Sequence, residues 1–184
     1  VVNKGDGNDI QNKLTQAGNN GGGVVYLPAG HYYVSNPLTI PSGVELKGAT
    51  DVSTVPHGSG SVLEVKTGEG RESGQGFITL RANSGVRGVT INYPDQVTNE
   101  FDTTITPKKY PYAIQGAGEN VYIVNVGLRA CYQGIDLFTN RCDNHYVDYV
   151  TGHVFDRGIR IGGGSENGVV SNSQVNVIVY ACGS

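Results

Sequence analysis

The sequence predicts an all-β fold in which short parallel strands are wound into a solenoid, a parallel β-helix. Three observations support this prediction: a repeat of about 23 residues, a composition rich in turn-forming residues, and an opening segment with one short helical stripe followed by glycines and an alternating strand. A period of this length combined with strand-like alternation is typical of a solenoid whose coils each contribute strands to parallel sheets.

The repeat is the strongest signal. An asparagine opens each of the three clearest units, at Asn120, Asn144 and Asn167, which lie 24 and then 23 positions apart. Less regular units follow Gly43 and Gly85. Asparagine and glycine suit a tight turn because they tolerate a left-handed backbone, and stacked asparagines can form a hydrogen-bonded ladder. A leucine-rich repeat would need recurring leucines, and a β-sandwich would not give this fixed register.

The composition agrees with this fold. Glycine accounts for 28 of 184 residues, and charged residues for only 16%, against about 25% in typical soluble domains. The formal net charge of −3 argues against a nucleic-acid partner, since phosphate-binding proteins normally carry a basic excess. No apolar run is long enough for a membrane span. The length fits one domain, residues 1–184.

The N-terminal segment predicts a cap. Ile10, Leu14 and Ala17 form one apolar helical stripe that ends at Gly18, and a glycine cluster then leads into the strand-like run VVYLPAGHYYV. We therefore expect a cap region over 1–23 and coils over 24–184. Loops are expected where the repeat is lost, near 50–75 and 97–111.

The opening segment and the repeat together resemble the pectate-lyase-like superfamily of right-handed parallel β-helices over essentially the whole chain. The run GVTINYPDQ at residues 88–96 is similar to a segment of carbohydrate-active members. The resemblance implies a capping helix and a secreted or cell-surface protein that handles a polysaccharide or oligosaccharide. It is specific for the fold and not for the reaction. Because the last residues fall where earlier coils carry a Gly-Ile pair, we expect further coils beyond Ser184.

Strand alternation predicts columns of outward-facing side chains on successive coils, about 4.8 Å apart. In this pattern Ile135, Leu137, Ile159 and Ile161 point inward. One outward column contains Gln115, Asp136 and Arg160; the others are Tyr132/Asp156/Val179, Gln133/Arg157/Tyr180 and Arg129/His153/Asn176.

The favoured function is a glycoside hydrolase. Residues 153–161 loosely resemble the place where polygalacturonase-like glycosidases carry two adjacent aspartates, and this resemblance implies Asp156 as the general acid. Arg157 stands where the second aspartate would be, so Asp136 is the candidate second carboxylate, because glycoside hydrolysis normally needs a pair. The substrate-binding candidates are Arg157, Arg160, His153, Arg129, Gln133 and Tyr132.

Two alternatives remain open. A polysaccharide lyase acting by β-elimination would use a base and a cation beside the uronate carboxylate, with the arginines and His153 as candidates. Such lyases usually bind calcium through stacked acidic residues, and no such column appears, so the sequence predicts no metal or cofactor unless the protein is a lyase. The second alternative is a non-catalytic adhesin or phage tailspike, which would assemble as a trimer. Asp136 and Arg160 could also simply pair on the surface.

The three cysteines show no metal-ligand spacing. Cys131 and Cys142 are either small buried hydrophobes or, in a secreted protein, a disulfide. Cys182 stands apart from both near the end of the chain.

Overall fold

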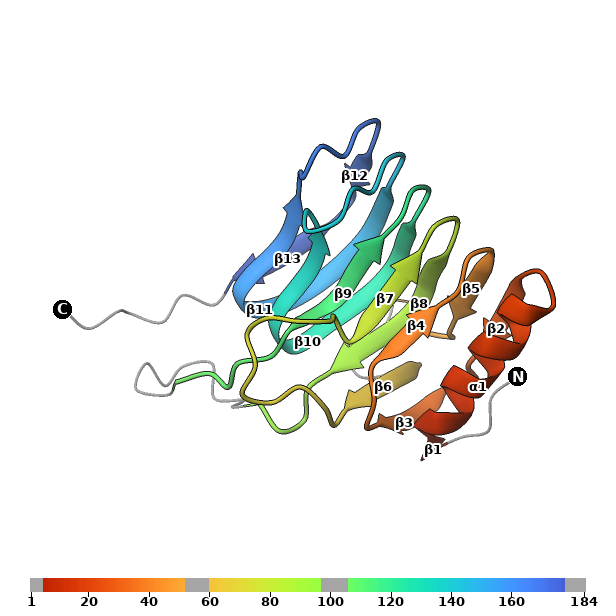
Figure 1. Ribbon diagram of the computed structural model, residues 1–184. Helices are drawn as coiled ribbons and strands as arrows, with labels where there is room; N and C mark the ends of the chain where they lie inside the picture. The colour runs from red at the N-terminus through yellow and green to blue at the C-terminus, as the bar shows by residue number, and fades with distance from the viewer. Residues whose placement is uncertain (1–4, 52–59, 97–105, 178–184) are drawn as a thin grey trace.

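The computed structural model describes residues 5–51, 60–96 and 106–177 and forms a stack of coils built from parallel strands (Figure 1). The elements in chain order are β1 (Gly5–Asp6), α1 (Gly7–Asn19), β2 (Gly23–Tyr26), β3 (Gly30–Val34), β4 (Leu38–Ile40), β5 (Val44–Lys47), β6 (Ser61–Val65), β7 (Ile78–Arg81), β8 (Gly85–Asn92), β9 (Tyr112–Ala117), β10 (Tyr122–Leu137), β11 (Tyr146–Ile161), β12 (Val169–Ser171) and β13 (Gln174–Val177).

The strands form three parallel sheets around one core. The first sheet contains β2, β5 and β12, the second contains β1, β3, β6 and β13, and the third contains β4, β7 and β9. β8 runs through the first and second sheets, whereas β10 and β11 are long enough to run through all three. The predicted parallel β-helix is therefore confirmed.

The predicted asparagine ladder is present at the turn that precedes the first sheet. Asn83, Asn120, Asn144 and Asn167 adopt left-handed backbone angles, with φ of 57°, 54°, 56° and 56°. Asn120 Nδ2 donates to Asn83 Oδ1 at 2.8 Å, and Asn144 Nδ2 donates to Asn120 Oδ1 at 3.0 Å. The side chains thus link successive coils parallel to the axis of the stack.

One member of the predicted repeat was assigned to the wrong residue. The turn before β8 is made by Asn83, whereas Gly85 is the first residue of the strand. Gly85 is needed for a different reason: the ring of Tyr122 on the next coil lies over it, and a Cβ atom there would collide with that ring. This position lets the Tyr122 hydroxyl donate to Glu45 Oε2 at 2.7 Å.

The predicted capping helix is confirmed as α1. Ile10 and Leu14 are fully buried and Ala17 packs against the same core. The helix ends at Asn19, one residue later than predicted, and the Gly22 amide then donates to the Ala17 carbonyl at 2.9 Å to close the C-terminal turn. Figure 1 shows α1 beside β2 and β3 at the N-terminal end of the stack.

The predicted loop at 50–75 needs correction, because residues 61–65 form β6. This strand is buried along its length and pairs with both β3 and β8, so it belongs to a coil. Residues 66–76 contain no strand, as expected for an inserted loop. The second predicted loop covers residues 97–111. Residues 106–111 contain no strand, and residues 97–105 lie outside the described residues.

The core is continuous and fills the inside of the coils. Ile135 and Leu137 point inward and are fully buried, as predicted. Ile159 is only partly buried and Ile161 is 40% exposed, because no described strand covers the third-sheet part of β11 on its far side. Cys131 and Cys142 are buried and free, so the disulfide alternative is wrong. Cys182 lies outside the described residues.

Candidate functional site

A pocket of about 460 Å³ opens on the outer face of the third sheet. Its floor consists of two columns of side chains in register on neighbouring strands of β9, β10 and β11. The order within both columns is the one predicted from strand alternation. Tyr112 was not predicted to belong to the first column, and Tyr180, which was, lies outside the described residues. The two columns are Tyr112–Gln133–Arg157 and Gln115–Asp136–Arg160.

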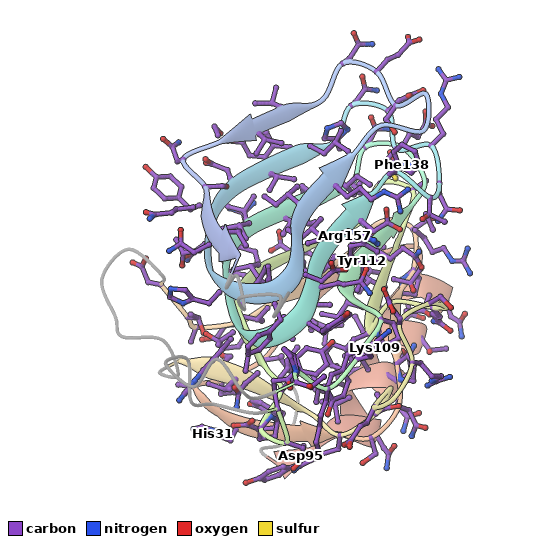
Figure 2. All side chains as sticks on the ribbon, turned by 90° about the vertical axis from the view of Figure 1, so that its left-hand side faces the viewer. His31, Asp95, Lys109, Tyr112, Phe138 and Arg157 are labelled. Atoms are coloured by element: carbon purple, nitrogen blue, oxygen red, sulfur yellow. The ribbon has the colours of Figure 1, made fainter. Side chains whose placement is uncertain are left out.

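Segment 66–76 supplies Glu72, Ser73 and Gly74 to the pocket lining, and segment 106–111 contacts it from behind the lining; we call the two the wall segments. Lys109 Nζ lies 2.6 Å from Glu72 Oε2, and the Gly70 amide donates to the Lys109 carbonyl at 2.9 Å. Figure 2 shows Lys109, Tyr112 and Arg157 on the same side of the molecule. Exposed ion pairs of this kind contribute only about 0–1 kcal/mol each, so other contacts must fix the wall.

Asp136 has a structural environment that is unusual for a catalytic acid. It is 1% exposed. Its Oδ1 accepts hydrogen bonds from the amides of Phe138 and Thr139 at 3.0 and 3.1 Å, and its Oδ2 accepts one from Gln115 at 3.1 Å. Burial alone would raise the pKa of Asp136, but the hydrogen bonds from Thr139, Phe138 and Gln115 outweigh it and leave the pKa lowered. Asp136 is therefore ionised at neutral pH and holds the turn that follows β10.

Glu72, the wall carboxylate that lines the pocket, was missed by the sequence analysis. It stands in a segment without repeat pattern, and only the fold brings it over the third sheet. The hydrogen bond and the charge of Lys109 lower the pKa of Glu72. Both carboxylates that line the pocket are thus held in the ionised form.

Two guanidinium groups line the pocket. Arg160 Cζ lies 3.8 Å from the centre of the Phe138 ring, and within the described residues Arg160 forms no ion pair, so the predicted surface pair with Asp136 is absent. Arg157 Nε lies 3.5 Å from Asp156 Oδ2. The neighbouring Tyr112 hydroxyl and the charge of Asp156 raise the pKa of the Arg157 guanidinium. The contact between Tyr112 and Arg157 does not have the geometry of a hydrogen bond.

The other predicted catalytic residue, Asp156, does not line the pocket. It lies at an irregularity in the pairing of β10 with β11, where β11 carries one more residue than β10 between two paired positions. This irregularity interrupts the predicted column of Tyr132 and Asp156. Asp156 Oδ2 is buried and forms no hydrogen bond within the described residues. Burial, followed by the charges of Glu72 and Asp156, raises the pKa of Tyr132, which also lies outside the pocket lining.

The third predicted column lies on the second sheet, away from the pocket lining. His153 and Asn176 are in register there, with Nε2 and Nδ2 3.4 Å apart, and Arg129 is in register with Asn92. Asn92 Nδ2 donates to Glu64 Oε2 at 2.6 Å. The sequence analysis did not single out Glu64, whose other oxygen contacts His31 Nδ1 at 2.7 Å.

Two further properties of the described residues bear on the site. No group of three or more His, Cys, Asp or Glu side chains is arranged there to hold a metal ion. None of the described helices has the length and apolar character needed to cross a membrane.

The chain resembles solved structures of the same architecture. The A-module of Azotobacter vinelandii mannuronan C-5 epimerase AlgE4 superposes with a TM-score of 0.59 and 20% identity over 85% of this chain and 48% of the module. The AlgE6 A-module of the same organism gives 0.56 and 21% over 95% and 52%. A candidate glycosyl hydrolase from Parabacteroides merdae gives 0.55 and 19% over 92% and 76%.

These similarities show the fold, and the chain spans about half the length of the two epimerase modules. No curated protein matches the sequence. The family described as rhamnogalacturonase A/epimerase, pectate lyase-like, matches residues 3–180. The protein therefore belongs to the rhamnogalacturonase A/epimerase family and has its carbohydrate-active, right-handed parallel β-helix fold.

Proposed function

We propose that the protein acts on an acidic polysaccharide and binds a uronate unit in the pocket on the third sheet. The observation that carries this proposal is the pair of guanidinium groups, Arg157 and Arg160, at the ends of the two floor columns. A guanidinium presents a planar fork of N–H donors that matches a carboxylate. Arg160 has no carboxylate partner among the described residues, so its donors are available to a ligand.

The pocket favours proton abstraction beside the uronate carboxylate, as in a lyase or an epimerase, over hydrolysis. Hydrolysis needs a carboxylic acid with a raised pKa, whereas the pKa values of both Asp136 and Glu72 are lowered. In proton abstraction, the arginines would stabilise the charge that develops on the sugar. Tyr112, whose buried hydroxyl forms no hydrogen bond within the described residues, is the candidate proton-transfer group.

The comparisons support the same substrate class. The family description includes an epimerase, and two of the similar structures are epimerase modules that act on mannuronan. Polysaccharides of this kind lie outside the cytoplasm, so we also propose that the protein is secreted or displayed at the cell surface.

Glycoside hydrolysis is the second candidate, and Asp156 is the observation that favours it. Its buried Oδ2 lacks a hydrogen bond within the described residues, and Asp136 would be its partner carboxylate. The neighbouring Arg157 opposes this role because its Nε lies 3.5 Å from the same oxygen and would compete with a substrate for it.

The test is incubation of the protein with polygalacturonate, polymannuronate and a neutral polysaccharide. Reducing ends, absorbance of the unsaturated product and sugar stereochemistry by NMR would be followed together. The proposal is supported if Arg160→Gln abolishes the absorbance or the inversion of stereochemistry while the control Arg141→Gln keeps it. Arg141 is a suitable control because it pairs with Asp143 and does not line the pocket.

Reducing ends alone, abolished by Asp156→Asn, would make the protein a hydrolase. Binding of a glycan without any reaction would favour the adhesin or tailspike alternative. Activity confined to the neutral polysaccharide would refute a uronate substrate.

A further inference from the structure

One side chain of the pocket floor is hydrogen-bonded to both wall segments. Gln133 Nε2 donates to the Glu72 carbonyl at 2.8 Å and to the Tyr110 carbonyl at 3.1 Å. The first acceptor belongs to segment 66–76 and the second to segment 106–111. Gln133 is 1% exposed; its hydrogen bond to Tyr110 is buried and the one to Glu72 is partly buried, in contrast to the exposed ion pair of Lys109 with Glu72.

These two bonds determine the orientation of the amide. Both partners are backbone carbonyls, which only accept hydrogen bonds, so the nitrogen of the Gln133 amide must face them. The oxygen, Oε1, consequently faces elsewhere, and it is buried without a hydrogen-bond partner in the described part of the chain. Buried carbonyl groups nearly always have a partner, and a buried group without one is unfavourable in the folded state.

The wall segments have other buried contacts as well: the Tyr110 ring is 2% exposed and packs on Tyr93 with ring centres 4.7 Å apart, and Gln96, 4% exposed, is hydrogen-bonded to the Lys108 backbone. Lys108 Nζ lies 2.8 Å from Glu69 Oε1, and both side chains are substantially exposed. The Tyr110 hydroxyl donates to Glu69 Oε2 at a long 3.3 Å. The Gln133 amide differs from these contacts because, among the described residues, it is hydrogen-bonded to both wall segments at once.

We propose that Gln133 is a positioning residue with two separable roles. Its nitrogen holds both wall segments over the pocket, and its oxygen accepts a hydrogen bond from a hydroxyl of the sugar unit bound there. The second role rests on the proposed function, because it requires a hydroxylated ligand in this pocket. The first role depends only on the contacts described above.

Two variants separate the roles. Gln133→Met removes the donor and the acceptor at nearly constant volume, whereas Gln133→Glu removes the donor but keeps an acceptor oxygen. Gln75→Met is the matched control, since Gln75 lies on a wall segment, is exposed and does not line this pocket.

Hydrogen exchange of the ligand-free protein tests the first role. The Gly70 amide donates to the Lys109 carbonyl. Its exchange rate should rise at least about tenfold in both Gln133 variants, the factor expected from the loss of one net hydrogen bond. The rate should be unchanged in Gln75→Met. Amides of β8 should keep their rates, which separates local loosening from global unfolding. An unchanged Gly70 rate would overturn the positioning role, whatever the substrate is.

Calorimetric binding of trigalacturonate, and of its derivative with methylated ring hydroxyls and free carboxylates, tests the second role. Wild type should prefer the hydroxylated form by about tenfold or more. Gln133→Met should lose this preference, and Gln133→Glu should retain it even if both affinities fall.

If the wild type binds trigalacturonate and all variants show the same preference for the hydroxylated compound, the acceptor role is overturned and the proposed function stands. A wild type that binds neither compound would overturn both the acceptor role and the uronate proposal. The exchange result for the wall would stand in either case.

Discussion

Asp136 and Arg160 lie directly opposite each other on β10 and β11, and yet they do not form an ion pair. The carboxylate turns back to the amides of the turn after β10, and the guanidinium stacks on the ring of Phe138 in that turn. Both groups thus stabilise the same turn by different means. This arrangement leaves the N–H edges of Arg160 for a ligand.

We predict that Asp136→Asn destabilises the fold by about 1–2 kcal/mol, because the turn loses a charged acceptor for two backbone amides. Urea unfolding would measure the change. The control is Asp95→Asn, which removes an exposed pair with Lys66 and should change stability by no more than about 0.5 kcal/mol. Equal effects of the two substitutions would contradict the assigned role of Asp136.

The lowered pKa of Asp136 predicts an acid dependence of stability. Since the folded pKa lies below the unfolded value of about 3.9, this group contributes stability above that value, and the contribution is lost as pH falls through the folded pKa. The pKa values of Asp143 and Asp148 are also lowered, by hydrogen bonds from the Glu166 amide and from Asn172 respectively. Unfolding curves between about pH 6 and pH 2 should therefore fall less steeply in Asp136→Asn than in wild type; parallel curves would count against the lowered pKa.

Arg160→Lys is predicted to weaken trigalacturonate binding by about tenfold or more, because an ammonium neither stacks on Phe138 nor forms a bidentate pair with a carboxylate. Phe138→Leu should have a smaller effect in the same direction, since it removes the stacking surface and keeps the charge. Calorimetry with Arg141→Lys as the control would measure both. An effect of Phe138→Leu alone would show that the ring, and not the guanidinium, contacts the ligand.

Gly85→Ala is predicted to destabilise the fold by about 1–3 kcal/mol, because the added methyl displaces the Tyr122 ring from its contact with Glu45. The cost should largely disappear in the background of Tyr122→Ala, where the ring is absent. Thermal or urea unfolding of the four proteins forms a double-mutant cycle. Additive costs would mean that the glycine is needed for another reason.

Asn120 offers a test of the ladder. Asn120→Gly keeps a backbone that tolerates a φ of 54° but removes the side-chain hydrogen bonds to Asn83 and Asn144, whereas Asn120→Ala also strains the turn. We expect both variants to be less stable than wild type, with alanine about 1 kcal/mol worse than glycine. If glycine matched wild type, the ladder would contribute nothing measurable.

The sequence predicted the parts of the structure that local rules govern. Turn residues such as Asn120 and Asn144 must recur wherever the backbone is left-handed, and alternation then orders neighbours such as Gln133 and Arg157 without further information. These rules were sufficient for the architecture, the capping helix and both columns of the pocket floor with the exception of Tyr112.

Other features depend on interactions that spacing does not encode. Asp156 does not follow its predicted column because β10 and then β11 each carry one extra residue between Leu128 and Gln133, and nothing in the local pattern marks these two irregularities. β6 was missed because its five residues are all buried and show no alternation. Glu72 reaches the pocket only through contacts between two loops far apart in the sequence.

The asparagine column has a consequence for how such a molecule can change in length. Asn120 bonds both to Asn83 on the turn before it and to Asn144 on the turn after it, although 37 residues separate the first pair and 24 the second. The column therefore fixes how the turns stack and not the length of chain between them, and insertion of one complete coil would extend the molecule by about 4.8 Å. Duplication of residues 120–143 is therefore a natural way to extend this protein, and because the pocket floor takes residues from β9, β10 and β11, the extra coil would lengthen both floor columns.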